Sequence, residues 1–240
     1  MKKTKRFFTR KELEERSKDF HQLVREALEK EDIETAKYWA GRNEATKDYI
    51  HDMYLAALPR MLSLIHERFG DDVVAQLWRD TVKSFIEPVW VMKAQLIKEG
   101  GLRAFIDFYV DIWRQHCGKF KVEEDDEKII ITHQPCGGGG LLVDRGLYDD
   151  SVFAERKYQG KGHHTFNQEG LPLYCGHCVW AHMAQPMKAT GEPLWCHDSD
   201  HPFPRKPGDP CIHYIFKDPA KIPEKYYNMV GVKKPKQGSP

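Results

Sequence analysis

The feature that most constrains this chain is a stretch rich in cysteine and histidine between residues 133 and 213. It holds five of the six cysteines and eight of the twelve histidines in a chain of 240 residues. Most of them fall in four short pieces: 133–136, Cys175-Gly-His-Cys178, 196–201 and Cys211-Ile-His213. Thiolates and imidazoles are the ligands that zinc and its neighbours prefer. We therefore expect a metal site, and a fold that brings these pieces together.

Four cysteines are the predicted metal ligands. Cys175 and Cys178 are two residues apart, so one tight turn can aim both sulfurs at a single ion. Cys178 is also expected near a helix N-terminus, where backbone amides favour a thiolate. The other two predicted ligands flank turns: Cys136 lies between proline and glycine, and Cys211 opens an expected strand. We interpret the remaining cysteines as buried small hydrophobic residues: Cys117 and Cys196.

The number of protein ligands decides what such a site does. Four thiolates would close a tetrahedral zinc site, which is structural, whereas three protein ligands leave room for a water whose pKa falls to about 7. Zinc is the predicted metal, and iron or an iron-sulfur cluster is the alternative, because cysteine ligation also serves iron. A thioredoxin-like redox use of the Cys175-Gly-His-Cys178 motif is a further alternative, although no βαβ pattern precedes the motif.

Histidines and a carboxylate near the predicted ligands could supply the chemistry of an enzyme. The predicted catalytic residues could act as acid, base or proton shuttle: His164, His177, His197 and Asp198. The predicted substrate-binding residues are His133, Gly138, Gly139 and Arg145. The glycines would let a ligand approach the backbone, and the arginine would hold a substrate carboxylate. Without a following lysine and serine, the glycine run does not predict a nucleotide site.

Helical periodicity dominates the chain before Cys117. The apolar spacing predicts four helices, over residues 9–28, 32–70, 71–100 and 102–117. A capping box at Thr9 begins the first helix. Pro59 is expected to kink the second helix and Pro88 to interrupt the third, because proline removes a helical hydrogen bond. Glycines at 70 and 100–101 are expected to end these two helices.

From Lys119 onward the period changes to that of strands. Residues 120–132 predict a hairpin that delivers His133 and Cys136 at its end, and strands at 193–197 and 211–217 predict a second hairpin. Between the hairpins, a short helix is expected after Cys178, ended by Pro186 and Gly191. The sequence thus predicts an α+β fold, in which an N-terminal helical region packs on a small antiparallel sheet of two hairpins with an intervening short helix.

The predicted organisation is one compact unit in three parts. Residues 1–118 form the helical region, 119–217 the metal-binding α+β region and 218–240 a C-terminal tail. This order of elements, closed by Gly208-Asp209-Pro210-Cys211, resembles the ligand-binding fold of the vinyl-reductase-type domains and of the proteins grouped with L-2-amino-thiazoline-4-carboxylate hydrolase. In those groups a Gly-Asp-x-Cys segment opens the last strand. The resemblance covers about residues 60 to 217 and implies a small-molecule pocket between helices and sheet, sometimes with metal-binding cysteines.

Charge and hydropathy narrow the expected partners. The 37 basic and 36 acidic residues nearly cancel, and no basic reading helix stands out, so no nucleic-acid partner is expected. No run approaches the roughly 18 apolar residues of a membrane-spanning helix, and no apolar signal core follows Met1. We therefore expect a soluble cytoplasmic protein that binds no membrane.

Two classes of function follow from these features. The predicted function is a metal-dependent enzyme, with zinc as its metal, that acts as a hydrolase or lyase on a small anionic or aromatic molecule through a metal-bound water. The alternative is a non-catalytic, zinc-stabilised protein that binds or senses a small molecule, with a pocket formed by helix aromatics such as Tyr54, Trp90, Phe105 and Tyr109. A homodimer is left open.

Overall fold

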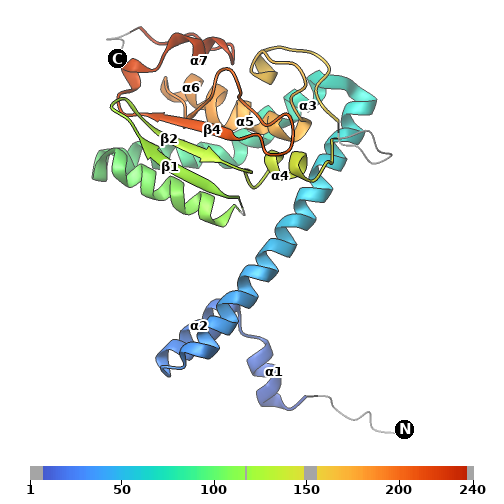
Figure 1. Ribbon diagram of the computed structural model, residues 1–240, viewed down its shortest axis with the longest axis vertical. Helices are drawn as coiled ribbons and strands as arrows, with labels where there is room; N and C mark the ends of the chain where they lie inside the picture. Colours follow the sequence, from blue (N-terminus) through green and yellow to red (C-terminus); the bar gives the residue numbers. More distant parts are fainter. Residues whose placement is uncertain (1–7, 117, 149–155, 237–240) are drawn as a thin grey trace. The chain divides into compact units, whose positions relative to one another are not determined.

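The computed structural model describes residues 8–116, 118–148 and 156–236 of the chain (Figure 1). The fold is mixed α and β with a small antiparallel sheet, as the sequence predicts. The backbone forms two compact units, residues 1–54 and 55–240, and their boundary falls inside the long helix α3. All the elements that carry the predicted site lie in the second unit.

The first unit contains two short helices and the beginning of α3 (Ile33–Gln115). The capping box predicted at Thr9 is present and begins α1 (Arg10–Arg16). The expected single helix over 9–28 is two helices, because Asp19 forms a second capping box with Gln22 and begins α2 (Phe20–Glu29). Leu23 of α2 is buried, and Phe20 lies 6.3 Å from Trp39 between ring centroids, so apolar contacts join α2 to α3.

Helix α3 consists of three helical segments, 33–69, 71–100 and 102–115. Gly70 (φ 77°) and Gly101 (φ 70°) separate them in a backbone conformation that glycine adopts readily, so the predicted helix ends at these glycines are confirmed. The predicted interruption at Pro88 is wrong, because the backbone stays helical across it. Buried Val82 and Trp90 anchor the turns on either side. No helix in the described residues is both long enough and apolar enough to span a membrane.

The sheet contains both predicted hairpins. β1 (Phe120–Glu124) pairs with β2 (Lys128–His133), and β3 (Cys196–His197) pairs with β4 (Cys211–Phe216). β2 and β4 also pair, which joins the hairpins into one antiparallel sheet in the order β1-β2-β4-β3. The register sets His133 opposite Cys211 and His197 opposite His213. Paired residues in a sheet project to the same face, so these two pairs, with Cys211 and His213 two residues apart on β4, share one face.

Helical segments cover both faces of this sheet (Figure 1). On one face, Ile129 and Ile131 of β2 and Ile215 of β4 join a core with the last segment of α3, which contributes Phe105, Tyr109 and Trp113. On the other face, Tyr214 and Phe216 meet Tyr226 of α7 (Glu224–Asn228) at ring-centroid distances of 6.3 and 5.8 Å. The residues of the site therefore lie on the face that is packed against α3.

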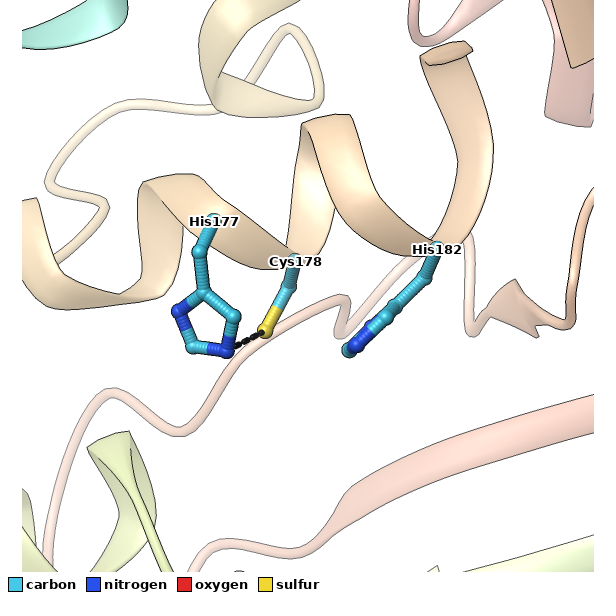
Figure 2. A group of neighbouring side chains, drawn as sticks. All are labelled: His177, Cys178 and His182. Carbon is cyan, nitrogen blue, oxygen red and sulfur yellow. Dashed lines mark hydrogen bonds between the residues drawn. The ribbon is translucent and has the colours of Figure 1, made fainter. Parts of the chain in front are cut away.

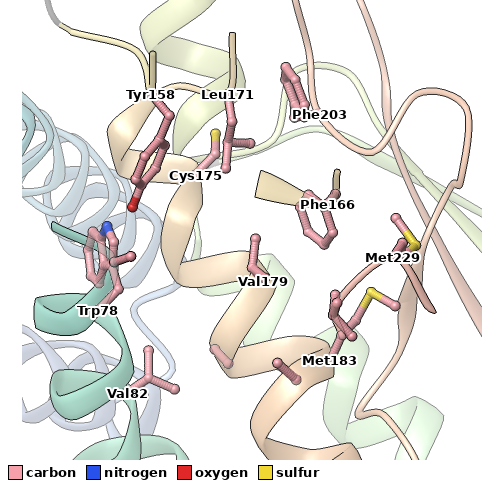
Figure 3. Close-up of a cluster of buried hydrophobic side chains, with 14 of the residues drawn as sticks. Trp78, Val82, Tyr158, Phe166, Leu171, Cys175, Val179, Met183, Phe203 and Met229 are labelled. Atoms are coloured by element: carbon pink, nitrogen blue, oxygen red, sulfur yellow. The ribbon is translucent and has the colours of Figure 1, made fainter. Parts of the chain in front are cut away.

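A second helical stretch runs without interruption from residue 176 to 190. It comprises α5 (Gly176–Cys178), the π-helical turn η3 (Val179–Ala184) and α6 (Gln185–Thr190). Gly191 ends it with φ 85°, as predicted, whereas Pro186 lies at the start of α6 and ends nothing. Val179 and Met183 pack in one apolar core with Trp78 and Val82 of α3 (Figure 3), which holds this helical stretch beside α3.

Short segments complete the described chain. The glycine run after Cys136 leads into α4 (Gly139–Asp144). Three single turns of 3-10 helix follow: η1 (His163–Thr165), η2 (Leu173–Cys175) and η4 (Pro219–Lys221). η2 leads directly into α5, so the backbone between Cys175 and Cys178 is helical rather than an open loop.

Candidate metal centre

The sheet supplies one wall of the candidate site. Alternation along β4 puts Cys211 and His213 on its buried face, and pairing adds His197 from β3 and His133 from β2. All four side chains are almost completely buried. Their proximity follows from strand register, since the residues come from three different strands.

The helical stretch 176–190 supplies the opposite wall. His177, Cys178 and His182 project from the same side of it (Figure 2), and their potential ligand atoms lie within 4.8 Å of one another. Nε2 of His177 is 3.4 Å from Sγ of Cys178. The π turn between His177 and His182 aligns residues five positions apart, because its hydrogen bonds run from residue i to i+5. Such turns occur frequently at functional sites.

A second group of possible ligands joins the two walls. His182, His197 and His213 are all buried, and one nitrogen of each lies within 4.8 Å of the others. Nδ1 of His182 is 2.8 Å from Nε2 of His197. His182 belongs to both groups, so they form one continuous cluster. Three imidazoles that converge in this way match the ligand set of catalytic zinc sites.

Backbone carbonyls fix the orientation of two of these imidazoles. Nδ1 of His177 donates to the carbonyl of Tyr174 at 2.6 Å, and Nδ1 of His197 donates to the carbonyl of Pro202 at 3.1 Å. A carbonyl only accepts, so each ring carries its proton on Nδ1 and keeps a lone pair on Nε2. Histidines that bind metals almost always have their second nitrogen tied to oxygen in this way.

The hydroxyl of Tyr109, in α3, contacts two of the sheet histidines and can fix the orientation of their rings. Its hydroxyl lies 2.5 Å from Nδ1 of His213 and 3.3 Å from Nε2 of His133. If Nδ1 of His213 donates to the phenol oxygen, the phenol can donate to His133, and Nε2 of His213 remains free to bind a cation. Sγ of Cys211 is 3.4 Å from that Nε2.

Burial keeps the imidazoles of the cluster neutral. It lowers the pKa of His133 and of His197 to about 3, and it lowers the pKa of His182 and His213 well below the ordinary value. A neutral imidazole is the form that binds a metal. The cluster therefore offers lone pairs at every pH near neutrality.

Burial affects the thiols in the opposite sense. It raises the pKa of Cys175 and Cys178 well above the ordinary value, so the thiolate expected at Cys178 is not favoured by the chain alone. α5 is only three residues long, and desolvation outweighs its amides. A hydrogen bond from Cys211, with the amides of Gly140 and Gly138, lowers the pKa of Cys136 to about 7. A bound cation would deprotonate the other thiols.

All four predicted cysteine ligands line one small cavity. Its wall contains Cys136, Cys175, Cys178 and Cys211, together with the cluster residues His177, His182, His197 and His213. The cavity measures about 20 Å³. A polar cavity needs roughly 10 to 15 Å³ to hold one water, so this one has room for a single ion or water. The four separate pieces of sequence do converge, but the tightest ligand groups are built around histidines.

Glycines allow the cysteines to reach this cavity. A Cβ on Gly139 would lie 2.1 Å from Sγ of Cys175, and a Cβ on Gly137 would lie 1.5 Å from the carbonyl oxygen of His116. Any larger residue at these positions would collide with its neighbour. Gly138 and Gly139, predicted to contact substrate, line the small cavity; Gly139 makes room for the thiol of Cys175, and Gly138 makes room for the ring of Tyr174.

Four predicted site residues lie apart from the cavity wall. His133 is buried at the end of β2, beneath the Tyr109 hydroxyl. His164 packs on Tyr158, with ring centroids 5.2 Å apart. Asp198 accepts hydrogen bonds from the Tyr214 hydroxyl at 2.7 Å and from two backbone amides of its own turn. Arg145 follows the last residue of α4. None of the four is among the described residues that line the small cavity or a larger cavity of about 530 Å³ beside it.

Three residues of the site were not predicted from the sequence. His182 and His213 complete the cluster, and His116 lines both cavities. Two signals were present: His182 follows Cys178 by four residues in a helix, and His213 follows Cys211 by two in a strand, so each pair shares a face. Among the other cysteines, Cys196 is buried in the core as predicted, and Cys117 lies outside the described residues.

The fold and the site together define an α+β chain with a buried centre of histidine and cysteine. Comparison with known proteins found no matching family model, curated protein or solved structure. The resemblance to the vinyl-reductase-type domains and to the thiazoline-carboxylate hydrolase group stays a prediction.

Proposed function

We propose that this chain is a zinc-dependent enzyme, a hydrolase or lyase, whose metal is held by His182, His197 and His213. One observation carries the proposal: three buried imidazoles, with ligand nitrogens within 4.8 Å of one another, converge beside a cavity with room for one ion. The contacts that tie Nδ1 of His197 and of His213 to oxygen support it, because they turn Nε2 of both rings toward other possible ligands, His182 and Cys211.

The cysteines supply candidates for a further ligand. Cys178 belongs to the ligand group that contains His182, and Cys211 lies 3.4 Å from His213. A set of nitrogen and sulfur donors suits zinc. Iron-sulfur clusters are held mainly by thiolates, so the three histidines favour zinc over the iron-sulfur alternative.

Zinc held by three imidazoles would act as a Lewis acid and lower the pKa of a bound water to about 7. The protein itself would exclude bulk water, because Trp113, Phe166 and Phe203 line the cavity. His177 borders both cavities and, with Nδ1 tied to a carbonyl, directs the lone pair of Nε2 toward Cys178. Burial lowers its pKa, so it is neutral and able to accept a proton from a substrate or from water.

Metal content tests the ligand assignment. We expect one zinc per chain in the wild type by mass spectrometry of the purified protein, and loss of zinc in His182→Ala and in Cys178→Ser. The zinc contents of Cys211→Ala and Cys196→Ala form a matched comparison. Both thiols are buried in neighbouring strands, but only Cys211 lines the cavity. Full zinc in a folded His182→Ala variant would reject the histidine-based centre.

The second candidate is a non-catalytic, zinc-stabilised binder or sensor, and the apolar cavity beside the site favours it. Cobalt substitution separates the two candidates. In an enzyme with an open metal position, azide would shift the visible d–d bands of the cobalt protein. In a site closed by four protein ligands, azide would leave the spectrum unchanged.

The remaining proposals concern partners. A small molecule is the proposed ligand, and no nucleic acid is proposed. A homodimer is supported by apolar side chains on α3 of the first unit, where Tyr49, Met53 and Tyr54 are more than half exposed at helical spacing. Light scattering coupled to size exclusion would measure the mass of the particle, and a mass of 28.0 kDa, that of one chain, would reject the dimer.

A further inference from the structure

A larger cavity of about 530 Å³ adjoins the small one. It lies between the segments of α3 and the helical stretch 176–190, and the two cavities share His177 and His182 in their walls. Leu77 of α3 lines it and is 38 % exposed, so this side chain lies near the opening to solvent. The larger cavity is therefore a route by which a molecule from solvent could reach the proposed metal centre.

The lining of the larger cavity is apolar. None of the described residues that form it is a lysine, arginine, aspartate or glutamate. Transfer of an ionised group from water into such surroundings, without a partner, carries a high cost in free energy. The predicted anionic substrate with Arg145 as its partner does not fit here, because Arg145 is not part of the lining.

Aromatic rings form one end of the cavity. Trp78 lies 6.1 Å from Tyr174 and 5.3 Å from His177 between ring centroids, and Trp195 lies 4.3 Å from His182. Aromatic pairs prefer edge or offset contacts and gain energy beyond the area they bury, so these rings would favour an aromatic guest. These aromatic residues differ from Tyr54, Trp90, Phe105 and Tyr109, the ones expected to form such a pocket.

The volume of the cavity limits the size of the ligand. A dry cavity of about 150 Å³ accommodates benzene, and a volume of about 530 Å³ is more than three times larger. It also lies within the range of roughly 300 to 1,000 Å³ that is typical of small-molecule sites. A molecule of two or three fused rings would fill it.

We propose that the larger cavity binds the substrate, and that this is a neutral, largely apolar molecule of two or three rings. Its reacting end would pass between His177 and His182 to the metal centre, since both residues border the two cavities. The role of this molecule as a substrate rests on the proposed function, whereas its binding rests on the cavity alone.

Binding of a neutral three-ring fluorophore, N-phenyl-1-naphthylamine, tests the inference in the full-length protein after treatment with EDTA. We expect one saturable site per chain from the rise in probe fluorescence. Naphthalene should displace the probe at least tenfold more effectively than 1-naphthoate, which has the same rings and a negative charge. Leu77→Asp should weaken binding at least tenfold, because it places a charge in the wall.

Leu64→Asp is the matched control. Leu64 lies on the same helix and is 47 % exposed, but it is not part of the lining, so this variant should bind the probe within twofold of the wild type. Absence of saturable binding, equal displacement by naphthoate, or equal effects of the two substitutions would each overturn the inference. A protein that binds the probe but no zinc would reject only the proposed function, whereas one that binds zinc but no probe would reject only the substrate class.

Discussion

The hydroxyl of Tyr109 is the most direct test of whether His213 is a metal ligand. Tyr109→Phe removes the group that lies 2.5 Å from Nδ1 of His213 while it keeps the ring, which packs on Trp195 at 4.6 Å. Removal of an outer partner of a metal-binding histidine costs roughly tenfold to hundredfold in metal affinity. We therefore expect zinc affinity to fall by about 1.4 to 2.7 kcal/mol.

The substitution also affects the fold, and the two effects need separate measurements. His213 and His133 are both buried, and each loses its bond to the hydroxyl. A buried polar group without a partner costs about 1 to 3 kcal/mol, which urea unfolding of the zinc-free protein would measure. Zinc affinity would be measured by competition with a chromophoric chelator, at a temperature where both proteins are folded.

Tyr158→Phe is the control for the loss of a buried hydroxyl. Tyr158 is 2 % exposed, and its hydroxyl has no hydrogen-bond partner within the described chain. It lines neither of the two cavities, so its removal should leave zinc affinity within twofold of the wild type. If Tyr109→Phe also bound zinc within twofold of the wild type, His213 would not be a ligand and the proposed centre would be wrong.

Three further predictions concern the fold. Ile131→Ala, at a fully buried position of β2, should lower the free energy of unfolding by about 2 to 5 kcal/mol in urea, whereas Val122→Ala, at an exposed position of the edge strand β1, should change it by less than about 1 kcal/mol. Tyr214→Phe should lower the free energy of unfolding by about 1 kcal/mol at pH 7, a figure discounted for partial exposure. Burial raises the pKa of Asp198, but hydrogen bonds, including the one from Tyr214, hold that pKa below its ordinary value. The difference in stability from the wild type should therefore vanish as the pH falls through the pKa of Asp198. Burial lowers the pKa of Lys93, so the folded state binds fewer protons than the unfolded state as the pH rises toward 10.5. Over this range the wild type should therefore gain stability relative to Lys93→Met. An equal pH dependence of stability in the two proteins would contradict this.

Much of the architecture was predictable because it depends on neighbours in the sequence. The helix ends at Gly70 and Gly101, the capping box at Thr9 and both hairpins follow from patterns a few residues long. Two expectations about the helices were wrong. Pro88 was expected to break a helix that the buried side chains on either side maintain, and one expected helix is divided by a second capping box at Asp19.

The sequence by itself determined that cysteines and histidines would dominate the site, and that the chain would be α+β. Only the tertiary structure decided which of them form ligand groups. The pairing of β3 with β4 sets His197 beside His213, and packing of the 176–190 helical stretch adds His182, a residue that was not predicted to belong to the site. The physical reason is that the positions of the ligands depend on strand register, and their protonation states depend on desolvation. Both arise from contacts between residues far apart in the chain, and neither is encoded in local spacing.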